Sequence, residues 1–402
     1  MPKHIAIVGA GPVGVVAALA AAQQGFRVSL YEAESRVDES PRAATTHPST
    51  LEMIAQVGLI DRYIAEGLTA RHFQFWDHVS RTMVAEFDHE ILKDETPYPF
   101  VVQTEQHKLA YMGLDKLRSY PDASVHFDHR VTSVLQTEDQ VTLTIAAPDG
   151  EIRVEADYVI AADGGRSTLR KALDIPFEGM TWPERFIVIT IKDDFESLMG
   201  CCYRNYLAHP DAWTNLFKIS GDDMQGRWRA VMPSAIDESD EEALSDEAVA
   251  RRLTHVLPKA EPYHVLHKNI YRVHQRVAAR FRKGRVFLAG DAAHVNNPIG
   301  GLGLNCGIHD AMELVETLTN VERGEADASI FDRYERRRRQ INIDYVQQQT
   351  IANKKRLEEK DPAVRAKALD EMRKIAEDPE RHRQFLLRSS LIESVRKAKS
   401  VA

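Results

Sequence analysis

A glycine-rich turn near the start of the chain constrains its fold more than any other feature. Residues 5–8 form a short apolar run, and Gly9-Ala10-Gly11-Pro12-Val13-Gly14 follows directly, matching the pattern G-x-G-x-x-G. In that pattern the first glycine allows a tight turn, the second lets the backbone approach a pyrophosphate, and the third lets a helix pack closely on a strand. The alanine-rich residues 13–24 predict a buried helix that ends at Gly25, and residues 27–31 predict the next strand. The sequence therefore begins with a β-α-β unit of the dinucleotide-binding type.

Glu32 strengthens this interpretation because of its position. It ends the second predicted strand, 18 residues after Gly14, where a carboxylate accepts hydrogen bonds from the ribose hydroxyls of an adenosine. The unpaired N–H groups and the positive dipole end of the helix favour a pyrophosphate at the turn. NAD and FAD both carry an adenosine diphosphate, so the turn alone fits either cofactor.

Composition and charge exclude several classes of protein. The net charge of −8 argues against a nucleic-acid binder, which usually carries a basic excess. The three cysteines (Cys201, Cys202 and Cys306) have neither the count of a disulfide framework nor the spacing of a zinc site, so we expect free, buried thiols and no metal. The longest apolar stretch, residues 13–22, is about half the length of a membrane span. With no signal peptide before the first strand, we expect a cytoplasmic protein that binds neither nucleic acid nor membranes.

Further along, strand and helix patterns alternate. Residues 141–145 and 152–154 predict a hairpin around a turn at 148–150, and buried strands are predicted at 157–162 and 285–290. Strands mix with an acidic segment in residues 182–271, where residues 237–246 predict a loop that runs into a helix containing residues 249–257. A helix is predicted at residues 304–321, with Ile308, Ala311, Met312, Val315 and Leu318 on one face. Charged amphipathic helices are predicted from residue 331 on, with the four arginines at 336–339 on a solvated face.

Two distant segments decide between NAD and FAD. The run Ala161-Ala162-Asp163-Gly164-Gly165-Arg166 follows one buried strand, and Gly290-Asp291-Ala292-Ala293-His294 follows another. Pro298-Ile299-Gly300-Gly301-Leu302-Gly303-Leu304-Asn305 comes soon after. In these segments the chain resembles the p-hydroxybenzoate hydroxylase-like, single-component (class A) flavoprotein monooxygenases. The fingerprints of that family are G-x-G-x-x-G, a D-G motif, and a G-D motif followed by P-x-G-x-x-G-x-N. All three occur here in order, and the resemblance extends over residues 1–345.

The resemblance implies a fold and a division into domains. The fold class is α/β with mixed α+β character: a Rossmann-like FAD-binding domain with a parallel sheet, interleaved with a smaller β-sheet substrate domain and followed by a helical C-terminus. We expect the FAD-binding domain to comprise residues 1–75, 98–180 and 272–345, and the substrate domain to comprise 76–97 and 181–271. Residues 346–402 are expected to be C-terminal helices that cover the flavin domain or pair subunits. No thioredoxin-like domain follows, so the chain is predicted to be of the shorter type.

The resemblance also assigns non-covalent FAD to specific residues. Asp291 is placed to accept hydrogen bonds from the ribityl chain, and bare backbone at Gly300, Gly301 and Gly303 lets N–H groups face the pyrimidine edge, which becomes anionic on reduction. The expected FAD-binding residues are Gly9, Gly11, Pro12, Val13, Gly14, Glu32, Ala33, Arg42, Gln103, Asp163, Gly164, Arg166, Gly290, Asp291, Pro298, Gly300, Gly301, Gly303, Leu304 and Asn305. Asp163, Arg166 and Arg272 correspond to positions that also contact the nicotinamide cofactor in members of that family.

The activity implied is aromatic hydroxylation. NADH or NADPH reduces FAD, O₂ adds to flavin C4a to give a hydroperoxide, and its distal oxygen attacks a small phenolic or heteroaromatic ring, with or without a carboxylate. A base or proton relay is expected, since a phenolate reacts faster than a phenol. The predicted catalytic residues are His47, Arg204, Tyr206 and Pro298, and further candidates are Tyr203, His209 and Arg229. The protein is expected to be a monomer or a homodimer.

Two other readings fit part of the sequence. A flavoprotein of the same fold can be a halogenase, a polyprenyl reductase or a drug-inactivating oxygenase, although Trp228-Arg229-Ala230 lacks the second tryptophan of the halogenase segment W-x-W-x-I-P. A NAD-dependent dehydrogenase or a nucleotide-sensing module without flavin is the remaining alternative. A purified protein without flavin absorbance, even after FAD is added, would favour it.

Overall fold

The computed structural model describes residues 2–42 and 44–401, and its first layer is a six-stranded sheet. The predicted β-α-β opening is confirmed: β1 (His4–Val8) pairs in parallel with β2 (Arg27–Tyr31), and α1 (Pro12–Gln23) connects them. On its other side β1 pairs in parallel with β12 (Tyr158–Ala161). The sheet continues outward through β8 (Ala123–His126), β19 (Val286–Leu288) and the antiparallel edge strand β18 (Arg282–Lys283).

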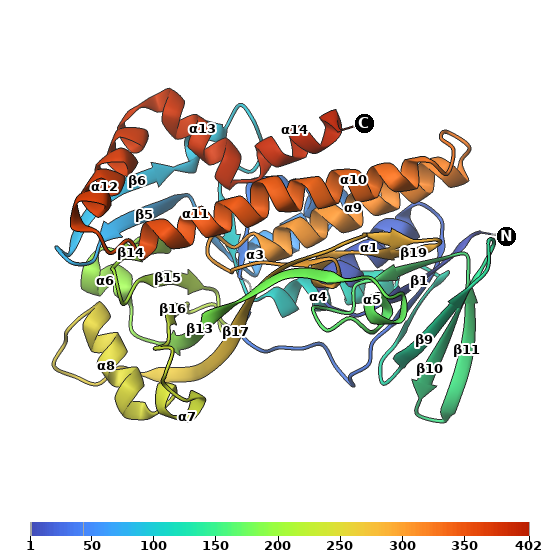
Figure 1. The fold of residues 1–402 in the computed structure, drawn as a ribbon, viewed down its shortest axis with the longest axis horizontal. Helices are drawn as coiled ribbons and strands as arrows, with labels where there is room; N and C mark the ends of the chain where they lie inside the picture. Colours follow the sequence, from blue (N-terminus) through green and yellow to red (C-terminus); the bar gives the residue numbers. More distant parts are fainter. Residues whose placement is uncertain (1, 43, 402) are drawn as a thin grey trace.

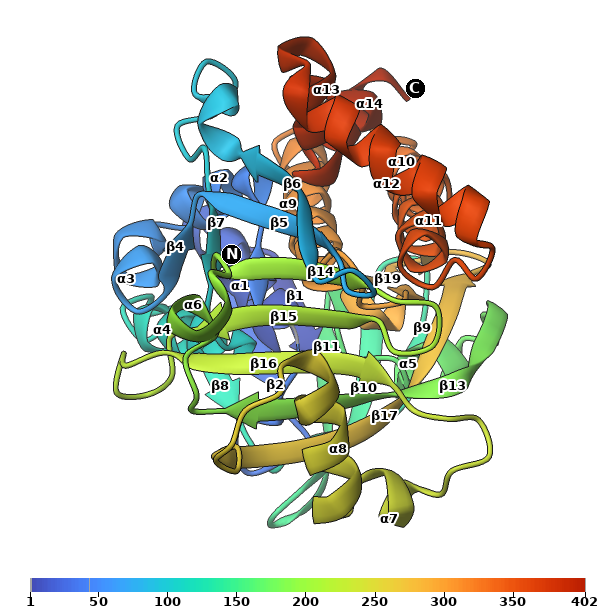
Figure 2. The same cartoon turned by 90° about the vertical axis from the view of Figure 1, so that its left-hand side faces the viewer.

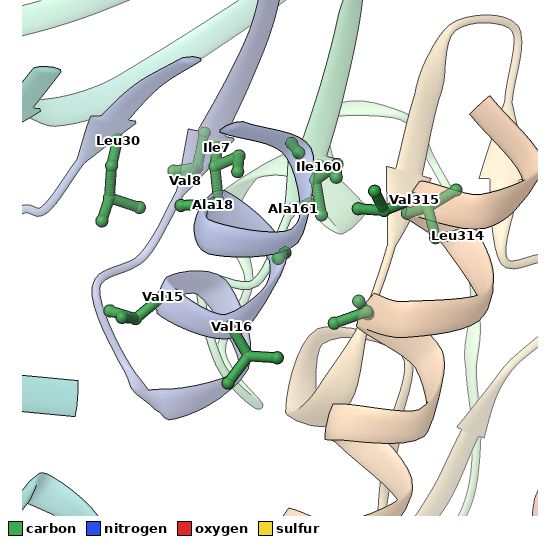
Figure 3. Close-up of a cluster of buried hydrophobic side chains, with 14 of the residues drawn as sticks. Ile7, Val8, Val15, Val16, Ala18, Leu30, Ile160, Ala161, Leu314 and Val315 are labelled. Atoms are coloured by element: carbon green, nitrogen blue, oxygen red, sulfur yellow. The ribbon is translucent and has the colours of Figure 1, made fainter. Parts of the chain in front are cut away.

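Helices cover this sheet and bury its apolar strands. The helices α4 (Gln106–Leu117) and α9 (Gly303–Glu322) both pack on α1. Figure 3 shows Val16 of α1, Leu314 of α9 and Ile160 of the sheet in one cluster of hydrophobic side chains, all of them fully buried. The apolar face predicted for residues 304–321 is confirmed, because it lies in this core. The strands of this sheet are covered on both faces, as is usual for parallel sheets.

The second layer is an eight-stranded, mostly antiparallel sheet with the strand order β20-β17-β13-β16-β15-β14-β5-β6. Its two long strands, β13 (Phe177–Ile191) and β17 (Val265–Ala278), pair along nearly their whole length and run from one layer to the other (Figure 2). The other strands are β5 (His72–Asp77), β6 (Thr82–Asp88), β14 (Arg204–Ala208), β15 (Thr214–Ile219), β16 (Arg227–Pro233) and β20 (His294–Val295). The domain boundaries stay a prediction, and β5 begins inside the segment 1–75 that was expected to belong to the FAD-binding domain.

Smaller elements complete both layers. The predicted hairpin is present as β10 (Val141–Ala147) and β11 (Gly150–Ala156). The strand β9 (Arg130–Gln136) pairs with the other side of β10 and completes a three-stranded sheet. A second three-stranded sheet consists of β3 (Thr45–Thr46), β7 (Val101–Gln103) and β4 (Leu68–Ala70). The short helices are α2 (Pro48–Gln56), α3 (Ile60–Ala65), η1 (His89–Leu92), α5 (Thr168–Ala172), α6 (Phe195–Met199), α7 (Asp240–Ala243), α8 (Asp246–Val256) and η2 (Gly290–Ala292).

The C-terminal helices lie across both layers (Figure 1). They are α10 (Ile330–Ile341), the π-helical η3 (Asn342–Gln347), α11 (Gln348–Leu357), α12 (Pro362–Glu377), α13 (Pro379–Ser389) and α14 (Ile392–Ser400). The contacts of α10 and α14 are with α9 and α2 of the flavin side, whereas α11 contacts β14 and α12 contacts β6. These helices therefore cover the substrate-side sheet as well as the flavin side. No helix among the described residues is long and apolar enough to cross a membrane.

The prediction that residues 336–339 lie on a solvated face is wrong for Arg338. Its side chain is buried, and its Nε donates to Asp310 Oδ1 at 2.6 Å. The other carboxylate oxygen of Asp310 accepts from His294 Nε2 at 2.6 Å and from the Gly290 N–H at 3.0 Å. Although burial opposes ionisation, His294 and Arg338 hold the pKa of Asp310 below its ordinary value. The run of arginines looked solvated because a sequence does not reveal the carboxylate on the neighbouring helix.

The expected free cysteines are confirmed. Cys201 and Cys306 are buried and Cys202 is partly buried, and all three are unpaired thiols. Burial raises the pKa of each thiol to about 12, so they are inert at neutral pH.

Candidate active site

A cavity of about 1240 Å³ lies between the two large sheets, at the carboxyl ends of the parallel strands. Four segments at the ends of β1, β2, β12 and β19 line it: residues 9–13, residues 31–34, residues 162–166, and Ala289 with Asp291. In open α/β sheets, ligands bind at this end of the strands. The three sequence fingerprints, far apart along the chain, meet on the wall of this one cavity.

The three glycines of the turn are constrained in different ways. Gly9 has φ +106°, and a Cβ there would lie 2.4 Å from the Ala162 carbonyl oxygen. A Cβ on Gly14 would lie 2.0 Å from the Gly9 carbonyl oxygen, so this glycine lets α1 pack on β1. A Cβ on Gly11 would meet nothing within 4 Å, because Gly11 faces the open cavity. The space left bare at Gly11, at the N-terminus of α1, fits a pyrophosphate.

Glu32 lies on the cavity wall next to this turn. Its Oε2 accepts from the Ala10 N–H at 2.7 Å and its Oε1 accepts from the Glu34 N–H at 3.0 Å. The carboxylate therefore fixes the turn and retains acceptor capacity toward the cavity, as a ribose diol requires. The neighbouring Ala33, Arg42, Pro12 and Val13 also line the cavity.

Asp163 carries a buried oxygen that has no partner. Its Oδ2 accepts from the N–H groups of Thr168 and Leu169 at 2.7 and 3.2 Å and so caps α5. Its Oδ1 is buried without a hydrogen bond, and burial raises the pKa of this carboxyl. A buried polar atom without a partner is costly, and Asp163 lines the cavity together with Gly164 and Arg166. This orphan oxygen fits a ligand that donates hydrogen bonds from within the cavity.

The third fingerprint forms a further part of this wall. Asp291, Pro298, Gly300, Gly301, Gly303 and Leu304 all line the cavity. Gly300 and Gly301 have φ values of +108° and +69°, which favour glycine, and the segment ends at the first residue of α9. Below it, the buried Asp310–Arg338–His294 network holds the Gly290 N–H. A bare, positively polarised backbone thus faces the cavity at a helix entrance.

Five predicted FAD or catalytic residues do not reach the cavity wall: Gly14, His47, Gln103, Gly290 and Asn305. Asn305 ties two cavity-lining segments together, since its Nδ2 donates to the carbonyls of Thr45 and Gly301 at 2.9 and 2.5 Å. Gln103 accepts from Thr45 Oγ1 at 2.5 Å and donates to the Tyr203 carbonyl at 2.8 Å. These side chains support the wall from behind, and their roles as direct contacts stay predictions.

His47 is a fully buried, neutral imidazole. Burial and the nearby Arg204 charge place its pKa well below the ordinary value. Its Nε2 lies 2.9 Å from the Gly300 carbonyl oxygen, which can only accept, so Nε2 carries the proton. Its backbone N–H donates to Asn305 at 2.8 Å, while Nδ1 is buried without a partner. The imidazole therefore holds the Gly300 turn in place.

Arg204 and Tyr206 lie where the cavity meets β14. Arg204 is 6% exposed, and its Nη2 donates to Tyr206 Oη at 2.8 Å and to the Gly300 carbonyl at 3.4 Å. Its guanidinium also lies 5.2 Å from the ring centroid of Phe73. The Tyr206 oxygen already accepts a hydrogen bond, so its O–H is free to donate. A cation and a hydroxyl thus stand side by side on the wall.

The remaining candidates differ in whether they line the cavity. Arg166 and Arg272 are exposed at the cavity wall, and together with Arg276 they lower the pKa of His274, after the larger effect of burial. Arg229 is buried behind the wall and donates to the Arg42 carbonyl at 3.1 Å. Tyr203 and His209 do not line the cavity, and His209 Nδ1 accepts from the N–H groups of Asp211 and Ala212.

Comparisons with known proteins agree with this geometry. Residues 3–349 match the family model described as FAD binding domain. The chain is 35% identical over 390 residues to para-nitrophenol 4-monooxygenase of Pseudomonas sp. (strain WBC-3), covering 95% of this chain and 94% of that protein. It is 31% identical to 6-hydroxy-3-succinoylpyridine 3-monooxygenase HspB of Pseudomonas putida (strain DSM 28022 / S16), covering 96% and 97%. The crystal structure of p-nitrophenol 4-monooxygenase PnpA from Pseudomonas putida DLL-E4 superposes with a TM-score of 0.91 at 33% identity, covering 98% of both chains.

The chain belongs to the FAD-dependent aromatic monooxygenases. The resemblance found in the sequence and the predicted fold class are therefore confirmed, and FAD is the dinucleotide for which the glycine turn is built. The alternative of a NAD-dependent dehydrogenase without flavin is set aside by the same findings.

This monooxygenase has a cavity floor that the sequence analysis missed. One row of cross-strand neighbours crosses the eight-stranded sheet: Asn269, Val188, Val231, Asn215, Tyr206 and Phe75. The first five line the main cavity. Because side chains in one such row share a face of the sheet, this row forms the floor opposite the flavin wall. Alternation within each strand is visible in the sequence, but the register that joins the strands into one row is not.

Proposed function

We propose that this chain uses NADH or NADPH and O₂ to hydroxylate a small phenolic or heteroaromatic compound. The observation that carries the proposal is that the FAD-binding segments and the floor of the eight-stranded sheet line the same cavity. The FAD fingerprints form one wall, and the floor from Asn269 to Tyr206 forms the other. A ring placed on that floor meets the segment from Pro298 to Gly303, where the resemblance puts the reactive part of the flavin.

The residues that would hold FAD follow from the fit of the walls. Gly11 and the α1 N-terminus would hold the pyrophosphate, Glu32 the ribose, and Asp163 and Asp291 hydroxyls of the ribityl chain. Gly300, Gly301 and Gly303 would face the pyrimidine edge. When bound, FAD accepts a hydride from the nicotinamide cofactor and activates O₂, which is chemistry that no side chain supplies.

The chain's own side chains would position the substrate and handle its proton. We propose that Tyr206 donates its free O–H to the oxygen of the substrate and that the adjacent Arg204 stabilises the phenolate. Pro298 would lie against the ring. His47 would act through the Gly300 carbonyl as a positioning residue, since it does not reach the cavity.

The test is a screen of the FAD-loaded protein for substrate-stimulated oxidation of NADH and NADPH. The names of two relatives suggest the first probes: 4-nitrophenol and 6-hydroxy-3-succinoylpyridine. Faster oxidation together with a hydroxylated product would support the proposal. Oxidation that yields only hydrogen peroxide, or no stimulation by any phenol or hydroxypyridine, would contradict it and favour a flavoprotein of the same fold with other chemistry. A cytoplasmic location and a monomeric or homodimeric state stay predictions.

A further inference from the structure

A second, small cavity adjoins the main one at the end of the floor row, where Tyr206 is followed by Phe75. Its volume is about 40 Å³, and it shares Arg204, Tyr206 and Gly300 with the main cavity. A cavity that binds benzene has a volume of roughly 150 Å³. The small cavity is therefore sized for a substituent of a few atoms, attached to a ring that lies in the main cavity.

The wall of this small cavity comes from two parts of the chain. Phe73, Phe75 and Tyr206 belong to the floor sheet, whereas Gln349, Asn353 and Arg356 belong to α11. Figure 2 shows α11 beside β14, in agreement with their contacts. The C-terminal helices thus complete the cavity and supply four of the six described polar side chains that line it.

The arginines of the small cavity favour a ligand group that accepts hydrogen bonds. Arg356 Nη1 donates to Asn353 Oδ1 at 3.2 Å, and burial lowers the pKa of its guanidinium with no carboxylate to offset the effect. Arg204 bonds only Tyr206 and Gly300 among the described residues. The Gln349 side-chain oxygen, which is buried without a partner, is itself an acceptor and does not contribute to this preference. Among the described residues, two guanidinium groups and no acidic side chain line this small cavity, and a buried cation without a countercharge is costly.

We infer that Arg356, next to Arg204 in this cavity, binds a planar two-oxygen substituent of the aromatic substrate, a carboxylate or a nitro group. The inference rests on the proposed function and narrows it to rings that carry such a group in addition to the oxygen that Tyr206 contacts. A guanidinium donates two parallel N–H groups, which match a pair of oxygens on one carbon or nitrogen. The surrounding Phe73 and Phe75 exclude water and strengthen these hydrogen bonds.

The test compares ligands that differ only in the substituent. The FAD-loaded enzyme is titrated with 4-nitrophenol, 4-hydroxybenzoate and 4-methylphenol, and binding is followed by the change in flavin absorbance. We expect the wild type to bind at least one of the two-oxygen compounds at least ten-fold more tightly than 4-methylphenol. Arg356→Met should remove this preference, a loss of roughly ten- to a hundred-fold, and leave 4-methylphenol binding within about two-fold of wild type.

The matched control is Lys355→Met, which removes an exposed cation from the neighbouring position of the same helix. It should bind all three compounds as the wild type does. If Arg356→Met loses its flavin, the comparison is made with Arg356→Lys, which keeps the charge but not the paired N–H groups and should lose part of the preference. If 4-hydroxybenzoate binds more tightly than 4-nitrophenol, the substituent that Arg356 binds is a carboxylate. If 4-nitrophenol binds more tightly, it is a nitro group.

Two outcomes would overturn the inference. One is equal binding of 4-methylphenol and the two-oxygen compounds by the wild type. The other is an Arg356→Met variant that retains the preference or weakens all three compounds equally. The proposed function fails separately, when no ring compound yields a hydroxylated product. Efficient hydroxylation of 4-methylphenol without preference would leave the proposed function standing and remove only the role of Arg356.

Discussion

The glycine turn offers a paired test, because Gly14 is packed against backbone whereas Gly11 faces the open cavity. A Cβ on Gly14 would lie 2.0 Å from the Gly9 carbonyl oxygen, and the neighbour is backbone that cannot turn away. The methyl of an alanine would force α1 off β1. Overpacking by extra methylenes costs about 1–3 kcal/mol, so we expect Gly14→Ala to lie at or above the upper end of this range. The flavin-free protein should already show the loss.

Gly11→Ala should behave in the opposite way. Gly11 has φ −67° and ψ 171°, which alanine adopts freely, and its Cβ would meet no atom within 4 Å. The gain of about 0.4–1 kcal/mol from a less flexible unfolded chain roughly offsets the poorer helix cap of alanine. The stability of the flavin-free protein should therefore stay within about 1 kcal/mol of wild type. The new methyl enters the pyrophosphate space, so FAD affinity should fall at least ten-fold, or about 1.4 kcal/mol.

Both variants are measured in the same two assays. Thermal unfolding of the flavin-free proteins reports the fold, and quenching of flavin fluorescence on titration reports FAD binding. The expected pattern is a lowered melting temperature for Gly14→Ala only, and weak FAD binding with a wild-type melting temperature for Gly11→Ala. A Gly11→Ala variant that binds FAD as tightly as wild type would refute the placement of the pyrophosphate.

Three further predictions concern single side chains. Glu32→Ala should weaken FAD binding roughly ten- to a hundred-fold, because it removes a charge-assisted hydrogen bond of about 1.5–3 kcal/mol; an unchanged titration would exclude Glu32 from the site. Asp291→Ala should give a folded protein that binds FAD poorly, and full flavin occupancy after purification would contradict its assignment. His89 has a pKa lowered to about 3 by burial and by the Arg204 charge, so the unfolded chain takes up a proton between pH 6.5 and 3 while the native protein does not. His89 should therefore lower the free energy of unfolding by about 1.4 kcal/mol for each pH unit below 6.5. When that free energy is measured by urea unfolding at several pH values, its dependence on pH should be weaker by this amount in His89→Gln.

The elements that could be predicted from the sequence are those governed by local pattern. The apolar runs at residues 5–8 and 157–162 and the alanine-rich helix after Gly11 form as expected. Glycines constrained by a positive φ or by close packing, such as Gly9 and Gly14, reveal the turn. The motifs also indicate which strand ends meet, because the carboxyl ends of parallel strands share one edge of the sheet.

The parts that could not be predicted depend on register and on partners from distant segments. The floor row from Asn269 to Tyr206 needs the pairing of five strands, which no local pattern specifies. Arg338 looks solvated until α9 supplies Asp310, and Arg356 lies on a helix that the sequence only showed to be amphipathic. Gln103 and His47 carry the polar groups expected of contacts, yet they bind neighbouring backbone and side chains behind the wall.

The most direct test of the central claim is a single anaerobic and aerobic comparison on the FAD-loaded enzyme with 4-nitrophenol and NADH or NADPH. The account predicts that the phenol accelerates flavin reduction without O₂, and that admitting ¹⁸O₂ then gives a ring-hydroxylated product that contains one labelled oxygen atom. A product without the label, or flavin reduction that no phenol or hydroxypyridine accelerates, would contradict the claim that this chain is an aromatic hydroxylase.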